Sequence, residues 1–510
     1  MKPARIQKIL VANRGEIAIR ICRTIREMGL RSVAIYSEAD QDAAHLFAAD
    51  EAFAVGPATA AQSYLNAGRI LDVARKAGAD AVHPGYGFFS ESASFAEQVQ
   101  GAGITWIGPS PGAIRALGDK LSARALALKA GVPVLPGTEK PVSGLAELRR
   151  AAERIGYPVV LKAAAGGGGK GMRRVNSADE FEQALRLTQG EAKNAFGDDR
   201  IYLERWLEKP RHIEVQLLGD VHGGVIALGE RDCSIQRRNQ KLVEETPSPA
   251  LDDARRAELW KLAVTMARAG GYANAGTAEF LMDQAGKFYF LEVNARLQVE
   301  HPITEMVLGI DLVREQIQMA AGERLAWTEE DVRPRGVALE FRIYAEDPEL
   351  GFLPQAGTVR RLELPQGPGV RCDVGVRAGG AVPIHYDPLV GKIIVWGNTR
   401  EHALARASRA LGECVLTGIP NTLPFHRWLL EQPAFRSGAY DTAFLAHEFK
   451  SVGRGDSARD EEDAVLLAAL YAQAAPRGPR EAHVGNRNGD ASPSRWRMAH
   501  PSLRAPLRPR

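Results

Sequence analysis

The chain has 510 residues, of which 45% are hydrophobic and 25% are charged, values typical of a folded globular protein and far from those of a disordered or fibrous one. At about 150 residues per domain, this length predicts about three structural units. The 65 lysines and arginines nearly balance the 62 aspartates and glutamates, so no overall field attracts nucleic acid or an anionic membrane surface. We therefore expect neither as a partner, and local groups have to hold any anionic ligand.

Four cysteines are spread widely along the chain, at Cys22, Cys233, Cys372 and Cys414. Their spacing matches neither a zinc site nor a disulfide framework, which fits a reducing cytoplasm. The basic start, residues 1–6, leads into residues 11–16 without an apolar stretch of signal-peptide length. No run approaches the roughly 18 apolar residues of a membrane-spanning helix. We therefore expect a cytoplasmic protein that has no membrane partner.

The first hundred residues alternate short apolar runs, at 9–12, 32–36 and 81–83, with amphipathic stretches. This order predicts a β-α-β unit and therefore a parallel sheet. The loop at 13–16 follows the first strand, where parallel sheets place ligands, but it lacks the glycine pattern of a dinucleotide site. The loop at 83–88, rich in proline and glycine, is either a turn alone or a second ligand-facing loop.

Residues 134–206 carry a second pattern, in which we expect a helix at 145–155 and a strand at 157–162, followed by the glycine run 166–169. Glycines allow backbone N–H groups to point inward and cradle phosphate oxygens, so this segment is a candidate nucleotide-binding lid that moves. The run is not a P-loop, because Gly171 stands where serine or threonine would follow the lysine. A flexible loop without a ligand is the alternative.

Two lysines are candidate phosphate ligands near this run. Lys162 ends the expected strand, and a buried lysine at that position needs an anionic partner. Lys120 is the weaker candidate, because a lone lysine is normally solvated.

Alternating polar residues mark three further expected strands, at 212–217, 276–281 and 288–292. Glu279 and Glu292 lie on two of them, joined by a short turn that contains Gly286, so an antiparallel pair places both carboxylates side by side. Such a pair repels unless a cation lies nearby, and magnesium prefers oxygen ligands that bridge it to nucleotide phosphates. Asn294 lies further along the same face and offers another oxygen. A surface pair screened by lysine or arginine is the alternative.

The run after Asn294 is dense in polar side chains, and we expect it to continue as an extended strand. Arg296 offers a planar fork suited to a small carboxylate-like anion, and Gln298 and the backbone of Val299 add donors. Glu300 is then a candidate general base, an effect worth roughly 10²- to 10⁴-fold in rate. A solvated strand face is the alternative, but the metal pair and the glycine run favour an anion site.

Strands expected at 337–342 and 392–396 belong to a further unit at about 336–449. Beyond Lys450 no lysine occurs, while proline, glycine, arginine and serine accumulate. We expect a helix near 460–475 and disorder in the rest of this tail.

Four stretches together resemble the biotin carboxylase family: 83–88, Lys162 with its glycine run, 231–238 and 292–302. The resemblance extends over about residues 5–447. Other ATP-grasp ligases share the glycine run and the metal carboxylates, but they lack counterparts of 231–238 and of the second half of 292–302.

The resemblance implies an α/β fold with an N-terminal parallel-sheet (pre-ATP-grasp) domain at 1–118, an ATP-grasp domain at 119–330 with a mobile lid at 134–207, a C-terminal α+β domain at 331–450 and a linker-like, mostly disordered tail at 451–510. The implied reaction uses ATP to convert bicarbonate to carboxyphosphate and transfers the carboxyl group to biotin on a carrier protein, releasing ADP and phosphate. It is the first half-reaction of an acyl-CoA or related carboxylase. A separate carboxyltransferase chooses the acceptor among acetyl-CoA, propionyl-CoA, methylcrotonyl-CoA, pyruvate and urea.

By the same resemblance, the ATP-binding residues are Lys120, Lys162, Gly168, Gly169, Glu204, Arg205, Trp206, Leu207, His212, Asn239, Glu279 and Glu292. The ligands of magnesium or manganese, expected as two ions, are Glu279, Glu292 and Asn294. The residues that hold bicarbonate are Lys241, Arg296, Gln298 and Val299. The expected catalytic residues are Arg296, Glu300, Lys241 and Arg342, of which Glu300 is the base and Arg342 binds biotin and stabilises its enolate.

Three positions depart from the family pattern: Asn239 stands where many members carry histidine, and Ala164 and Ala165 replace the small residues that usually extend the glycine run. Cys233 is expected to be a packed neighbour of the site, since this chemistry needs no thiolate. No biotin-attachment sequence occurs in 451–510, so we expect the carrier and the carboxyltransferase on separate chains and, by resemblance, a homodimer. Two alternatives stay open: a carboxylate–amine ligase, which activates a larger carboxylate, and a catalytically silent nucleotide-binding regulator.

Overall fold

The computed structural model describes residues 5–142, 144–163 and 172–451. The glycine run with Gly168 and Gly169, the two alanines before it, and the helix and disorder expected in the tail all lie outside these residues. In the described part of the chain, no helix combines the length and the apolar character needed to cross a membrane.

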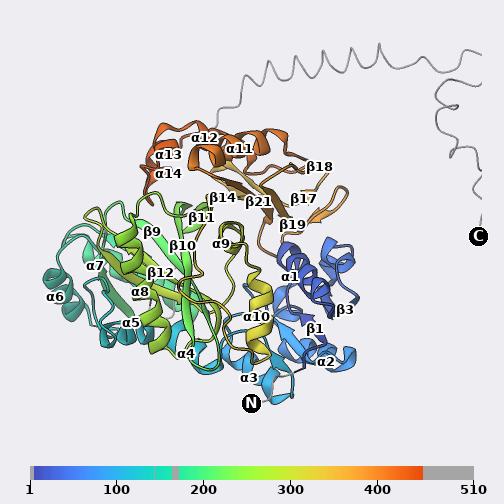
Figure 1. Ribbon diagram of the computed structural model, residues 1–510. Coiled ribbons are helices and arrows are strands. Elements are labelled where there is room, and N and C mark those ends of the chain that lie inside the picture. Colours follow the sequence, from blue (N-terminus) through green and yellow to red (C-terminus); the bar gives the residue numbers. More distant parts are fainter. Residues whose placement is uncertain (1–4, 143, 164–171, 452–510) are drawn as a thin grey trace, which may run out of the picture. The chain divides into compact units, whose positions relative to one another are not determined.

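The N-terminal part is a five-stranded parallel sheet of order β3-β2-β1-β4-β5, drawn in blue in Figure 1. Its strands are β1 (Lys8–Val11), β2 (Arg31–Ser37), β3 (Glu51–Gly56), β4 (Ala81–His83) and β5 (Thr105–Trp106). The helices of this part are α1 (Gly15–Glu27), α2 (Ala67–Ala77), α3 (Ala93–Gly101) and α4 (Pro111–Gly118). Apolar side chains such as Leu10, Val33 and Val82 are fully buried in its core. The predicted parallel sheet is therefore confirmed.

An eight-stranded sheet of order β13-β12-β9-β10-β11-β14-β21-β19 forms the centre of the described chain (Figure 1). Its strands are β9 (Arg211–Gly219), β10 (Val225–Arg237), β11 (Gln240–Thr246), β12 (Asn274–Met282), β13 (Phe288–Asn294), β14 (Val337–Tyr344), β19 (Val370–Val374) and β21 (Leu389–Gly397). The helices associated with it are α5 (Lys120–Lys129), α8 (Asp253–Ala269), α9 (His301–Leu308) and α10 (Leu312–Ala320). The strands predicted at 212–217, 276–281, 288–292, 337–342 and 392–396 are present as β9, β12, β13, β14 and β21, whereas β10, β11 and β19 were not predicted. Because β11 pairs with β14, with Val243 opposite Phe341, the central and C-terminal parts of the chain share one sheet.

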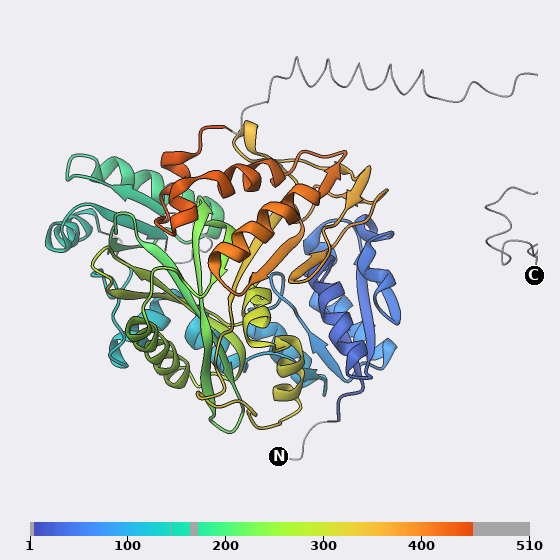
Figure 2. The same ribbon diagram turned by 45° about the horizontal axis from the view of Figure 1, so that its top comes forward.

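A smaller unit with its own core lies between these sheets in sequence. Its strands are β6 (Val159–Ala163), β7 (Met172–Val175) and β8 (Ile201–Arg205), in the order β7-β6-β8, and its helices are α6 (Leu145–Ile155) and α7 (Phe181–Phe196). Leu148, Leu161, Phe181 and Leu203 are buried in this core. In Figures 1 and 2 the teal unit and the blue N-terminal sheet lie on opposite sides of the green central strands. The helix predicted at 145–155 is confirmed; movement of the lid stays a prediction.

The C-terminal part combines the end of the central sheet with helices, as expected for an α+β domain. Helices α11 (Arg400–Glu413) and α12 (Leu423–Glu431), orange in Figure 2, pack beside each other, and α11 covers β21 and β14. The remaining short elements are β15 (Glu346–Asp347), β16 (Leu353–Pro354), β17 (Gly357–Thr358), β18 (Arg361–Glu363), β20 (Ala381–Val382), β22 (Val415–Thr417), α13 (Pro433–Ser437) and α14 (Phe444–Glu448).

Candidate active site

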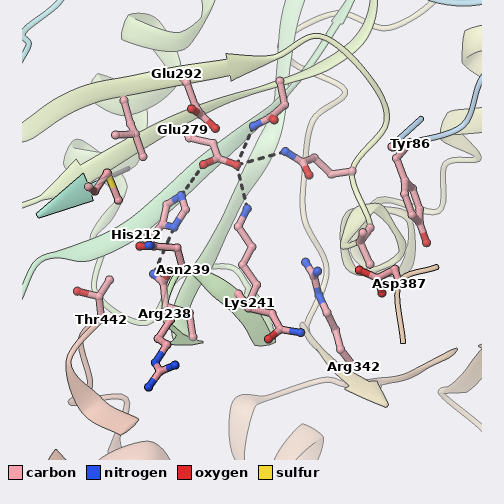
Figure 3. A pocket seen from close by; sticks show the side chains of 18 of the residues that line it. Tyr86, His212, Arg238, Asn239, Lys241, Glu279, Glu292, Arg342, Asp387 and Thr442 are labelled. Atoms are coloured by element: carbon pink, nitrogen blue, oxygen red, sulfur yellow. Dashed lines mark hydrogen bonds and ion pairs between the residues drawn. The ribbon is translucent and has the colours of Figure 1, made fainter. Parts of the chain in front are cut away.

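A cavity of about 1200 Å³ opens between the N-terminal loops, the lid and the central sheet. The expected site residues that line it are Lys120, Lys162, Arg205, Trp206, Leu207, His212, Asn239, Lys241, Glu279, Glu292, Asn294, Arg296, Gln298, Val299 and Arg342. Glu204 and Glu300 lie just behind its wall, in contact with Lys162 and Lys241. Figure 3 shows part of this wall, which also includes Tyr86. Residues expected to bind nucleotide, metal, bicarbonate and biotin therefore meet in one place.

Glu279 and Glu292 lie directly opposite each other on β12 and β13, in the register that the sequence predicted (Figure 3). Glu279 Oε2 lies 2.8 Å from His212 Nε2, and its Oε1 accepts a 2.9 Å hydrogen bond from Asn294 Nδ2. Burial opposes the charge of Glu279, but Lys241 and His212 hold its pKa well below the usual value. An ionised carboxylate beside a second carboxyl group and an amide suits magnesium or manganese, which prefer oxygen ligands.

Lys241 is the cation at the centre of the cluster. Its Nζ donates to Glu214 Oε2 at 2.5 Å, Glu279 Oε1 at 2.9 Å and Glu300 Oε1 at 2.6 Å. These carboxylates come from β9, β12 and the loop before α9, and at this spacing they would repel each other without a shared cation. The fully buried Arg231 holds Glu214 from behind, because its Nε donates to Glu214 Oε1 at 2.6 Å.

Glu300 is fully buried between two cations. Besides the bond from Lys241, its Oε2 accepts a 2.8 Å hydrogen bond from Arg342 Nη2. Burial favours the neutral acid, yet Lys241 and Arg342 keep the pKa of Glu300 well below its usual value, so the group is a carboxylate. Cys233 Sγ lies 4.0 Å from Glu300 Oε1, and burial raises the pKa of this thiol well above normal. A neutral thiol agrees with a packing role for Cys233.

Arg296 and Gln298 lie in a loop, so the prediction that the strand continues through them was wrong. Strand β13 ends at Asn294 and helix α9 begins at His301, with Pro302 in its first turn, where the missing N–H of proline is not needed. The loop allows the polar side chains to gather on one wall instead of alternating between two faces. Arg296 Nη1 donates to Gln298 Oε1 at 2.9 Å and Nη2 donates to Asn294 Oδ1 at 3.0 Å.

Glu91, in the segment between β4 and α3, fixes this loop from the N-terminal part. Its Oε2 accepts a 3.0 Å hydrogen bond from Arg296 Nε, and its Oε1 accepts one of 3.0 Å from the backbone N–H of Ala295. Sequence reasoning missed Glu91, because no local signal links residues 205 positions apart. It also missed Glu214, although the alternation of the predicted strand places Glu214 on the same face as His212.

The side of the cavity next to the lid holds two lysine–carboxylate pairs. Lys162 Nζ lies 2.5 Å from Glu204 Oε2, and Arg124 Nη1 lies 3.1 Å from the other oxygen of the same carboxylate. Lys120 Nζ lies 3.4 Å from Glu292 Oε2. Glu204 therefore supplies an anionic partner for Lys162 inside the protein, on the strand that leads to Arg205, Trp206 and Leu207 on the cavity wall, and phosphate binding by Lys162 stays a prediction.

The backbone conformation of the turn explains why asparagine suits position 239. Asn239 follows Arg238 in the tight turn that joins β10 to β11, and both residues have positive φ, 49° and 69°. Two consecutive left-handed residues are typical of a type I′ hairpin turn, in which asparagine is favoured. Both side chains line the cavity (Figure 3).

Comparison with known proteins decides the family. Three family models match the chain in order: "Biotin carboxylase, N-terminal domain" over 5–114, "Carbamoyl-phosphate synthase L chain, ATP binding domain" over 119–328 and "Biotin carboxylase C-terminal domain" over 340–447. The biotin carboxylase of Nostoc sp. is 51% identical over 441 residues, which are 86% of this chain and 99% of that protein. The chain belongs to the biotin carboxylase family. A pyruvate carboxylase subunit of Methanothermobacter thermautotrophicus is also 51% identical, over 86% of this chain and 89% of that protein.

Solved structures agree with the biotin carboxylase fold. The biotin carboxylase–β,γ-ATP complex of Campylobacter jejuni matches with a TM-score of 0.85 and 45% identity, covering 87% of this chain and 99% of that one. The biotin carboxylase domain dimer of 2-oxoglutarate carboxylase from Hydrogenobacter thermophilus, with MgADP, ADP and bicarbonate, matches with a TM-score of 0.86 and 44% identity, covering 89% and 100%. The predicted three-part architecture is confirmed, and the chain is a ligase that carries out the ATP-dependent carboxylation of biotin.

Proposed function

We propose that the cavity carboxylates biotin through carboxyphosphate, with its residues in the roles that the sequence predicted. The observation that carries this proposal is the position of Glu300. Its carboxylate is held by Lys241 and Arg342, and Lys241 also contacts Glu279 of the proposed metal pair. A base, an anion site and a metal site therefore form one connected network.

ATP would lie between the lid and the central sheet. The proposed contacts are Lys120, Lys162, Gly168, Gly169, Glu204, Arg205, Trp206, Leu207, His212, Asn239, Glu279 and Glu292. The complexes of relatives with β,γ-ATP and with MgADP support this assignment. Glu279, Glu292 and Asn294 would hold magnesium or manganese, proposed as two ions, whose chemistry is to neutralise charge on the transferring phosphoryl group.

Bicarbonate would be held by Lys241, Arg296, Gln298 and the backbone of Val299, beside Glu300. Glu300 takes the proton of bicarbonate, an oxygen of the resulting anion bonds to the γ-phosphorus, the bond to ADP breaks, and carboxyphosphate forms. The low pKa of Glu300 makes it a weak base as long as Lys241 contacts only the carboxylates of the protein. A bicarbonate anion that shares Lys241 weakens this stabilisation and raises the proton affinity of Glu300.

Biotin would meet Arg342 on the opposite side of Glu300. Transfer of the carboxyl group from carboxyphosphate to the biotin nitrogen breaks the C–O bond to the phosphate, and the phosphate that is released takes the N–H proton of biotin. Negative charge develops on the ureido oxygen as the nitrogen loses this proton and becomes a nucleophile. The Arg342 guanidinium is positioned to stabilise that charge, which exists only during transfer.

Partners and domain limits complete the proposal. We propose domains at 1–118, 119–330 with the lid at 134–207, and 331–450, followed by a linker-like tail at 451–510. A biotin carrier and a carboxyltransferase on other chains are supported by the relative that is named as one subunit of a pyruvate carboxylase, and a homodimer is supported by the dimeric structure. The proposed place of action is the cytoplasm.

The test is phosphate release from ATP with and without bicarbonate, and with free biotin as acceptor. Release that requires bicarbonate and rises with biotin is expected. Release that instead requires another carboxylate and an amine would favour the carboxylate–amine ligase. ATP binding without bicarbonate-dependent release would favour the silent regulator.

A further inference from the structure

Arg342, the proposed biotin-binding arginine, contacts two carboxylates through a single nitrogen. Its Nη2 lies 2.8 Å from Glu300 Oε2 and 2.5 Å from Glu244 Oε1. Its Nη1 donates to Tyr344 Oη at 3.3 Å. Figure 3 shows the guanidinium reaching toward the cavity from β14. The same nitrogen therefore donates a hydrogen bond to Glu300 and forms an ion pair with Glu244.

Glu244 reaches Arg342 from within the protein and does not line the cavity. It lies on β11, its side chain has no exposed surface, and Glu340 of β14 stands directly opposite it. None of the carboxyl oxygens of Glu340 and Glu244 has a hydrogen-bond partner among the described residues, and Glu244 is held to Arg342 by an ion pair. Burial raises the pKa of both groups, that of Glu340 well above its usual value, so Glu244, beside Arg342, carries the negative charge of this cross-strand pair more readily.

We propose that Glu244 is a positioning residue that holds Arg342 during carboxyl transfer, an inference that rests on the proposed roles of Glu300 and Arg342. When Glu300 accepts the proton of bicarbonate, it loses the charge that holds Nη2. A buried guanidinium without a counter-charge is costly. Glu244 supplies that counter-charge from the side away from the substrate, so Arg342 stays in place and its cavity-facing N–H groups are free for the charge that develops on biotin.

The charged and titratable groups around Glu244 are Arg342, Glu340 and Tyr344 on β14, Glu300 in the loop before α9, Cys233 on β10 and Lys241 on its own strand. Burial raises the pKa of Glu244 from 4.5 to about 7, against the opposing effect of Arg342. Glu244 is therefore protonated as the pH falls through about 7, and its hold on Arg342 weakens on the acid side. The rate of biotin carboxylation is therefore expected to fall as the pH is lowered through this range, which gives the pH profile an acid limb.

The experiment compares Glu244→Gln with Glu245→Gln. Glu245 is the next residue on β11, is equally buried, and pairs instead with Arg400, whose Nε lies 2.9 Å from Glu245 Oε2. We expect Glu244→Gln to lower kcat/KM for free biotin about 10- to 100-fold, the equivalent of one buried ion pair that holds Arg342 in place. The acid limb near pH 7 should disappear in this variant. KM for ATP and the biotin-independent, bicarbonate-dependent release of phosphate should stay within about twofold, since Lys241 still holds Glu300 and Glu244 pairs with Arg342 and not with a residue proposed for ATP.

Glu245→Gln is expected to keep the wild-type kinetics and the acid limb of the pH profile, even though its free energy of unfolding is lower than that of the wild type. Wild-type biotin kinetics in Glu244→Gln, or an acid limb that persists there, would overturn the proposal. If Glu244→Gln does not fold, Glu244→Asp answers the same question, because it keeps the charge but withdraws it by one methylene group. That variant should retain the acid limb while losing part of kcat/KM for biotin, and unchanged kinetics would contradict the inference. Absence of bicarbonate-dependent phosphate release in the wild-type protein would instead refute the proposed function.

Discussion

Replacing Glu300 by glutamine removes the carboxylate that Lys241 and Arg342 share while it preserves the size of the side chain. The proposed base is then lost, and general base catalysis is worth roughly 10²- to 10⁴-fold in rate. Bicarbonate-dependent phosphate release should therefore fall by about 10²- to 10⁴-fold, or roughly 3–5 kcal/mol of barrier. ATP affinity should change little, because Glu300 lies behind the cavity wall and contacts none of the residues proposed for ATP alone.

The contacts around Glu300 also indicate how much the substitution lowers the free energy of unfolding. Removing one partner of a buried ion pair costs roughly 3–5 kcal/mol when the other charge is left alone. Here Lys241 keeps Glu214 and Glu279, and Arg342 keeps Glu244. We therefore expect a loss of about 1.5–3 kcal/mol, the value of a charged hydrogen bond, so the variant should remain folded for assay.

The assay measures phosphate release against bicarbonate concentration, ATP binding by calorimetry and thermal unfolding. Glu230→Gln is a matched control, since Glu230 is also buried and lies 2.9 Å from an arginine, Arg256, away from the cavity. The control should lose stability but keep turnover. Wild-type turnover in Glu300→Gln, or an equal loss in the control, would refute the assignment of Glu300 as base.

Three further predictions test neighbouring groups. Arg296→Lys replaces a planar fork by one point charge and should raise KM for bicarbonate about 10- to 100-fold, measured by phosphate release; an unchanged KM would remove Arg296 from the bicarbonate site. Glu292→Gln removes one proposed metal ligand and should raise the magnesium concentration for half-maximal rate by at least about tenfold, whereas an unaltered magnesium dependence would contradict that role. Glu340→Gln concerns stability: the pKa of Glu340 is raised by burial, so the wild-type protein loses stability as pH rises. The difference in melting temperature, variant minus wild type, should therefore become more positive as the pH is raised from 5.5 to 8.5. A difference that becomes more negative would show that Glu340 is charged.

Five strands of the central sheet could be predicted from the local sequence: β9, β12 and β13 by their alternation of apolar and polar residues, and β14 and β21 by their strand-like composition. Strands β10, β11 and β19 were not expected. For Glu279 and Glu292, a short turn at Gly286 joins the strands and fixes their register, so the pairing followed from the sequence. The pairing of β11 with β14 joins parts of the chain about a hundred residues apart and has no such signal. The single sheet that extends from Glu279 and Glu292 to Arg342 was therefore not foreseen.

The loop after Asn294 was misjudged because polar alternation alone suggested a strand. Pro302 was available as a signal, since proline is favoured in the first turn of a helix, and the helix does begin at His301. Glu91 and Glu244 could not be found in this way. Each reaches its arginine from a distant part of the sequence, and an isolated glutamate gives no indication of its partner.

The charges of the site explain how a protein without a strong overall field handles small anions. Glu214, Glu279 and Glu300 contact Lys241 from three sides, and Arg231 and Arg342 stand behind two of them. Because acidic groups balance these cations, the site attracts no anion by excess charge alone. If Arg296 and Lys241 hold the anion as proposed, selection depends on the arrangement of their N–H donors, and only an anion small enough to reach both would bind. Glu91, which fixes Arg296, and Glu244, which pairs with Arg342, would then contribute to catalysis without touching a substrate.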